Sequence, residues 1–181
     1  MIAFRLRNRL LGFRRDTSGV SAIEFALILP AMVAMFFGIG EVTSYMQAHS
    51  RMTKVASTVA DLVAQDTSID NDELQNIFNC AEAIMQPFDS QNGWIRVTSV
   101  VANAQGQTTV AWSEGQGISD RATGSSITVP GGIVPPNQSI IFTEVSYNYT
   151  SSFGMFLNNG VTAEDQFYSR PRRSVSVARV P

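Results

Sequence analysis

An uncharged apolar run from Phe25 to Gly40 is the feature that most restricts how this chain can fold. Together with Val20 to Glu24, it approaches the ~20 residues that a helix needs to cross ~30 Å of hydrocarbon. The run is apolar on every side, so it suits lipid better than the surface of a soluble core. We therefore predict a transmembrane helix over residues 20–41, which Pro30 should kink or loosen near Ala26.

A basic leader precedes this segment. It contains one acidic residue, Asp16, and five arginines: Arg5, Arg7, Arg9, Arg14 and Arg15. The whole chain has a formal net charge of −2, so the part after the leader is clearly acidic. Basic residues beside a membrane span stay on the cytoplasmic side. This asymmetry predicts a cytoplasmic N-terminus and a C-terminal bulk outside the cytoplasmic membrane, and it does not indicate a nucleic-acid-binding protein.

Glu24 is unusual in such a segment, because an ionised carboxylate among lipid tails is costly unless it is paired. It follows Gly19 by five residues, and Phe25 comes directly after it. A secretory signal peptide would not need this carboxylate; its apolar region would also be shorter and would end in a small-x-small cleavage site. A plain membrane anchor in which Glu24 reaches toward the interface is the other simple interpretation.

The string Gly19-Val-Ser-Ala-Ile-Glu-Phe resembles the cleavage motif of class III signal sequences, which type IV pilins and pseudopilins carry. The resemblance implies that a prepilin peptidase removes residues 1–19 on the cytoplasmic side, after Gly19. Val20 would then be the first residue of the mature protein and Glu24 the fifth. The apolar helix would stay on the mature chain.

The longer string that ends at Pro30 resembles TadE-like minor pilins of the Tad (Flp, tight adherence) type IV pilus system, and Arg170 to Ser174 resembles their C-terminal region. This implies a single-pass protein of the bacterial inner membrane that supports Flp pilus assembly, adhesion and biofilm formation. Its head would face the periplasm or the pilus exterior. Its partners would be the prepilin peptidase, other pilin and Tad assembly subunits and the lipid bilayer.

The spacing of Val20 and Glu24 has a chemical use within this interpretation. Cleavage would create an α-amino group on Val20, about one helical turn or ~6 Å of axial rise from Glu24. The carboxylate could neutralise that amine on its own chain or on a neighbouring subunit, and so fix the register between helices. We therefore assign Gly19 and Val20 to processing, and Glu24, Phe25 and Pro30 to assembly.

The helical pattern continues beyond the span. Apolar residues at steps of three and four predict an amphipathic extension over residues 42–68, packed on a globular head. The stripe consists of Val42, Tyr45, Met46, His49, Met52, Val55, Ala56, Val59, Leu62 and Val63. Glu41 is placed off this stripe, and His49, on it, is given a packing role.

The predicted head, residues 69–181, is an antiparallel sheet with a helix, which makes the chain α+β and pilin-like. Asp70 and Glu73 form a capping-box pattern at the start of a second helix, with Ile69 stapled to Leu74, and Pro87 ends it. Strands are predicted at 94–101, 108–112 and 139–149, with 173–180 as a last strand. Residues 113–138 are predicted to form a long loop with a short strand at 126–129.

Three further features of the head leave alternatives open. The lone Cys80 is interpreted as a buried apolar residue, the alternative being an intermolecular contact. An apolar cluster near the C-terminus is predicted to cap the core, the alternative being a surface for another subunit; its members are Phe153, Met155, Phe156 and Leu157. The basic residues Arg170, Arg172 and Arg173 are candidate partner contacts, although most such runs are simply solvated.

Signals of catalysis are not found. His49 is the only histidine, and no Walker A, Cys-x-x-Cys or paired-carboxylate motif stands out. We therefore expect no enzyme activity, no cofactor, no metal site and no nucleic-acid partner. Two rival functions remain: a pseudopilin of a type II secretion system, and an uncleaved bitopic envelope protein with a ligand-binding head.

Overall fold

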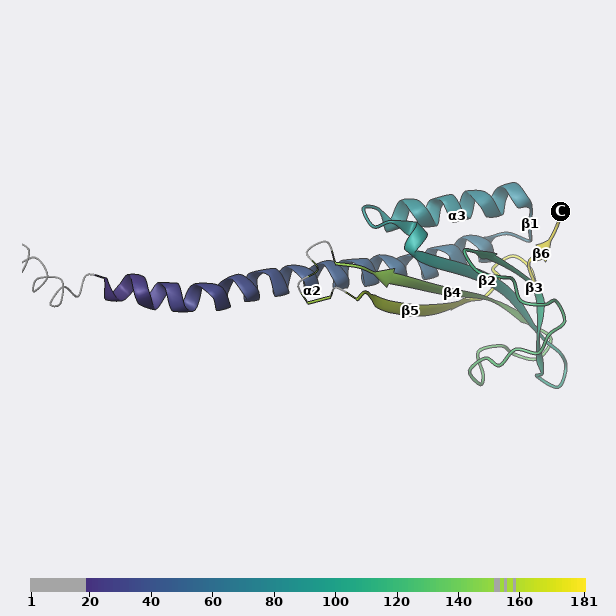
Figure 1. Ribbon diagram of the computed structural model, residues 1–181. Coiled ribbons are helices and arrows are strands. Elements are labelled where there is room, and N and C mark those ends of the chain that lie inside the picture. Colours follow the sequence, from purple (N-terminus) through teal and green to yellow (C-terminus); the bar gives the residue numbers. More distant parts are fainter. Residues whose placement is uncertain (1–18, 152–153, 155, 158) are drawn as a thin grey trace, which may run out of the picture.

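A single helix of 46 residues, α2 (Val20–Gln65), forms the axis of the molecule in the computed structural model, which describes residues 19–151, 154, 156–157 and 159–181. Its first half projects from the head and its second half runs through it (Figure 1). α2 continues without a break through Pro30, so the loosening that this proline predicts does not interrupt the helix. The arginines of the leader, Phe153 and Met155 lie outside the described residues.

The head combines a four-stranded sheet with a second helix, and the α+β prediction is confirmed. After α2 the elements are β1 (Ser68–Ile69), α3 (Asn71–Met85), the 3-10 turn η1 (Ser90–Asn92), β2 (Gly93–Ala102), β3 (Thr108–Gln116), β4 (Ser139–Tyr149), β5 (Val161–Ser169) and β6 (Ala178–Arg179). The sheet has the order β3-β2-β4-β5 and is antiparallel throughout. β1 and β6 form a separate short parallel pair.

The start of α3 is fixed by local chemistry, as the sequence predicts. The Asp70 side chain accepts a hydrogen bond from the Glu73 backbone N–H at 2.8 Å, and the Glu73 carboxylate accepts one from the Asp70 N–H at 3.1 Å. This reciprocal pair satisfies two backbone donors that a helix start leaves open. Ile69 and Leu74 are both buried in the core that lies beneath this end of the helix.

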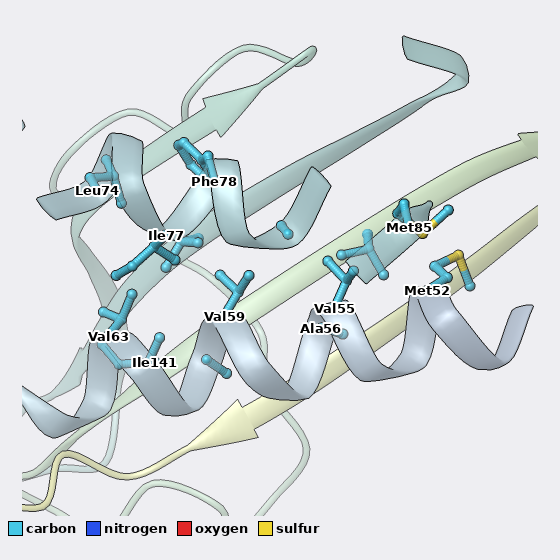
Figure 2. Close-up of a cluster of buried hydrophobic side chains, with 14 of the residues drawn as sticks. Met52, Val55, Ala56, Val59, Val63, Leu74, Ile77, Phe78, Met85 and Ile141 are labelled. Atoms are coloured by element: carbon cyan, nitrogen blue, oxygen red, sulfur yellow. The ribbon is translucent and has the colours of Figure 1, made fainter. Parts of the chain in front are cut away.

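The core lies where α2 packs against α3, β4 and β5. Figure 2 shows the apolar side chains of α2, from Met52 to Val63, facing those of α3 and Ile141 of β4. A second apolar cluster lies on the other face of the sheet, beneath residues of the loop that joins β3 to β4; its buried members are Val100, Ala102, Val110, Ile127, Val134, Ile140 and Phe142. Ile140 and Ile141 enter different clusters because successive strand residues point to opposite faces.

The predicted strand 139–149 matches β4, and the strands at 94–101 and 108–112 are present as the longer β2 and β3. Three other predictions differ from the structure. The long loop starts later, because β3 extends to Gln116, and the short strand at 126–129 is only an isolated bridge between Ser126 and Thr109. The last strand is confined to Ala178–Arg179.

Two assignments of single residues are also wrong. Cys80 is exposed, because it lies on the side of α3 opposite the buried Phe78 and Ala81. His49 is exposed as well, together with Val42 and Met46. In the turns at the start of the predicted extension, from residue 41 on, the buried face of α2 is rotated away from the predicted stripe. There the buried positions are Glu41, Ala48 and Met52.

Ile141→Ala should destabilise the head strongly. The side chain is 0% exposed between the sheet and α2, so its truncation leaves a cavity and is expected to lower the free energy of unfolding by about 2–5 kcal/mol. Chemical denaturation of the full chain in detergent measures this change. Val175→Ala is the matched control: Val175 is 68% exposed, and its replacement should cost less than about 0.5 kcal/mol. Equal effects in both variants would contradict the assigned core.

Candidate membrane and assembly segment

The projecting half of α2 exposes apolar side chains on all sides. Phe25 is 57% exposed, and Leu27 and Phe36 are more exposed still. Among the described residues, α2 is the one helix long and apolar enough to cross a membrane, and no part of its most apolar stretch is buried in the head. Exposing such an apolar surface to water costs a free energy of roughly 25 cal/mol per Å². The arrangement is compatible with single-pass membrane anchoring.

Gly19 lies immediately before the first helical residue, Val20. Its backbone has φ −84° and ψ −10°, a conformation open to any residue, and its carbonyl accepts a hydrogen bond from the Ile23 N–H at 3.1 Å. A Cβ atom added at Gly19 would meet no atom within 4 Å. The fold of the described chain therefore has no need for glycine at this position.

Glu24 lies one turn into α2 and is exposed. Within the part of the chain that the structure describes, no hydrogen bond or ion pair engages its carboxylate. Phe25 beside it and Pro30 two turns further are exposed too. These three residues, which the sequence assigns to assembly, lie exposed on the projecting helix, and no hydrogen bond or ion pair joins them to the described residues of the head.

Glu41 is a feature that the sequence reasoning missed. It ends the uncharged run of α2, yet it is 0% exposed. One carboxylate oxygen, Oε2, accepts hydrogen bonds from the backbone N–H groups of Phe156 and Leu157, each at 3.0 Å. Bonds from two donors offset the cost of burying a charged group. Glu41 therefore attaches the loop between β4 and β5 to α2 where the helix leaves the head.

The periodicity of α2 contained the signal for Glu41. The buried residues Ala48, Met52, Val55 and Val59 repeat at intervals of three and four, and continuing this pattern back by seven residues from Ala48 reaches position 41. The sequence analysis instead places Glu41 off the apolar stripe, among the polar residues.

The neighbouring loop only partly follows its prediction. Leu157 is half-buried and packs against the core, as expected, whereas Phe156 is 56% exposed. The ring of Phe156 lies against Gly38, where an added Cβ atom would be only 3.3 Å from a ring carbon. Phe156 thus does not cap the core of the head.

The C-terminal arginines are placed in different surroundings. Arg172 pairs with Asp61 of α2 through its side chain, and its backbone N–H donates to the Ala64 carbonyl at 2.9 Å. Arg170 donates to the Ile133 carbonyl at 3.2 Å. Arg173 is exposed beside a shallow surface hollow near Asp66. Two of these three candidate partner contacts therefore bind the head itself.

A cavity of about 200 Å³ lies between α3 and the strands β2 to β4. Glu82 and Gln116 line it and are hydrogen-bonded to each other at 2.8 Å, with Trp94 and Tyr147 nearby. Burial raises the pKa of the Tyr147 hydroxyl above its usual value. No group of three or more His, Cys, Asp or Glu that could hold a metal ion occurs among the described residues.

Comparison with known proteins bears on the helix. The family model described as TadE-like protein matches residues 19–61, from the residue before α2 through most of its length. No curated protein and no solved structure matches the chain. The matched segment includes Gly19, Glu24 and Glu41, and it stops before the sheet and the C-terminal arginines. Over residues 19–61 the chain is therefore similar to TadE-like proteins, in agreement with the resemblance seen in its sequence.

Proposed function

We propose that this chain is a minor pilin or pseudopilin that supports assembly of a Tad (Flp) pilus, and through the pilus adhesion and biofilm formation. It would enter the inner membrane with its N-terminus in the cytoplasm and its head in the periplasm. A prepilin peptidase would cut after Gly19, and the mature helix would pack with those of other pilin subunits. The role is structural, without catalysis.

The proposal rests mainly on the structure of α2 at the point where the family match begins. The match begins at Gly19 and the helix begins at Val20, so the boundary of the helix coincides with the proposed cleavage site. A glycine that the fold does not need fits a requirement set by another protein, such as a peptidase. The exposed carboxylate of Glu24 fits a partner outside the described chain.

The way the head is attached to α2 also suits assembly. The same helix that projects into the membrane contributes Met52, Val55 and Val59 to the core of the head. Head and anchor are therefore parts of one packed unit without a flexible linker between them (Figure 1). Packing of the projecting helices in a defined register would consequently fix the position of each head.

The rival functions make different predictions. A type II secretion pseudopilin would be cut at the same bond, but the TadE-like match favours the Tad system, which predicts a gene for a Flp-type major pilin nearby. An uncleaved bitopic protein would retain its leader and would tolerate changes at Glu24. The cavity beside Glu82 would be the place to seek a ligand in that case.

The N-terminal residue of the protein purified from its native membrane tests the central step. Mass spectrometry should find a mature chain that starts at Val20, with a free or methylated amine. A chain that starts at Met1 would contradict processing and leave a plain membrane anchor. The mass of the C-terminal peptide serves as the internal control for other proteolysis.

A further inference from the structure

We propose that Phe156 and Leu157, the loop residues held by Glu41, lie at the outer lipid interface of the membrane and that the Phe156 ring inserts there among the lipids. This inference rests on the proposed function in one respect: the projecting half of α2 must span the bilayer. It adds a second membrane contact, made by the head at a residue that lies 115 positions after Glu41 in the sequence.

The depth of the loop follows from its position on α2. Glu41 lies seventeen positions after Glu24, which is about 25 Å along a helix and close to the thickness of the hydrocarbon core. Glu41 thus lies near the outer boundary when Glu24 lies near the inner one. The two hydrogen bonds from Phe156 and Leu157 place this part of the loop at the same level.

The Phe156 ring extends from that level toward the membrane. Its contact, Gly38, lies on α2 about one turn before Glu41, on the side of the projecting segment. The absence of a side chain at Gly38 lets the ring approach the helix closely. More than half of the Phe156 surface remains exposed, next to the exposed side chains of Met35 and Ile39.

The surface around the ring is suited to lipid. An open groove lies between α2 and the loop, and its lining is almost entirely apolar: Ala34, Met35, Gly38, Ile39, Val42 and Phe156. Its one ionisable group, Glu41, is fully buried and bonded to the loop. The groove continues directly from the apolar surface of the proposed span. Aromatic and aliphatic side chains bind at the boundary of headgroups and acyl chains, and a lipid chain is thus the occupant that we infer.

Tryptophan fluorescence of the full chain, one copy per lipid nanodisc, tests this placement. The probe is Phe156→Trp in discs of phosphatidylcholine that is brominated either near the headgroup or near the chain end. The additional fluorescence from a tryptophan at position 156 should be blue-shifted relative to tryptophan in water. Lipid that is brominated near the headgroup should quench most of this fluorescence. The parent chain supplies the baseline from the native Trp94 and Trp112.

Two matched variants separate the possible outcomes. Phe36→Trp, on the projecting helix, reports whether the span itself is in lipid. Val175→Trp should be unquenched, because the Val175 carbonyl accepts a hydrogen bond from Ser139 at the end of β4 remote from the loop. Quenching at 36 but not at 156 would overturn the inference and leave the span intact. An aqueous emission at 156 would then indicate a solvated ring, and a blue-shifted but unquenched emission would indicate that protein covers the groove. No quenching at either position would overturn the span as well.

The role of Glu41 as a positioning residue can be measured in the same discs. Adding Glu41→Ala to Phe156→Trp removes the acceptor of both loop N–H groups, so lipid quenching at 156 should be lost. Glu41→Gln retains an oxygen acceptor and should restore part of it. The Phe36→Trp signal should be the same with or without Glu41→Ala. Undiminished quenching at 156 in the Glu41→Ala variant would show that Glu41 does not position the loop.

Discussion

Gly19→Leu should yield a folded chain that the prepilin peptidase no longer processes. The backbone at Gly19 has an ordinary helical conformation and a side chain there would enter open space, so the fold and thermal stability should be unchanged. A peptidase that binds the residue before the scissile bond closely would meet a bulky side chain. Displacing the reacting groups by about 1 Å can slow a reaction on the order of a hundredfold.

Processing can be followed by the mass of the chain after co-expression with a prepilin peptidase of a Tad system, and folding by thermal denaturation in detergent. Gly19→Ala is the matched control, and it should be cut nearly as fast as the parent because a methyl group is small. Normal cutting of Gly19→Leu would remove the proposed peptidase site. A loss of stability in Gly19→Leu would instead show that the fold depends on this glycine.

The elements that sequence reasoning found are those with strong local signals. The capping box of Asp70 and Glu73 marks the start of α3 within a few residues, and the β-branched run in 139–149 predicts β4 correctly. The apolar run before Gly40 predicts the projecting helix in the same way. Each of these depends on residues that are close together in the chain.

The features that were missed depend on distant residues. β5 contains Glu164, Asp165 and Gln166 and has one buried residue, Ala163, so its alternation is weak. It is a strand because it pairs with β4 along the edge of the sheet. Glu41 is likewise buried only because a loop more than one hundred residues later supplies two N–H donors. The sequence around residues 35–45 gives no information about those distant donors.

The exposure of Cys80 illustrates a different kind of error. Its burial was inferred from how free cysteines usually behave, whereas its position on α3 opposes the buried face. The face of the helix was already defined by Leu74, Ile77 and Phe78. The position of Cys80 on the helix therefore predicts its exposure better than the usual burial of free cysteines does.

Glu24→Ala should leave cleavage largely intact and abolish most pilus assembly. The exposed carboxylate lies about one turn from the α-amino group that cleavage would create on Val20, on the half of α2 that projects from the head. If it pairs with the amine of a neighbouring subunit, its removal leaves a cation near hydrocarbon without a partner. Breaking such a buried pair by deleting one member costs about 3–5 kcal/mol. A subunit contact weakened by that amount would lose affinity by more than a hundredfold.

The measurement compares two readouts in the same cells: the mass of the membrane-bound chain, and the amount of pilus sheared from the surface. Glu24→Asp keeps the charge on a shorter side chain and should retain part of the pilus assembly. Glu24→Gln keeps the shape but not the charge, and it should behave like Glu24→Ala. Ser21→Ala, on the same exposed end of α2, controls for a general effect of substitution there. Wild-type piliation in Glu24→Ala would show that the carboxylate does not set the register. Because the fold gives Glu24 no role within the described chain, this result would return the protein to the class of simple membrane anchors.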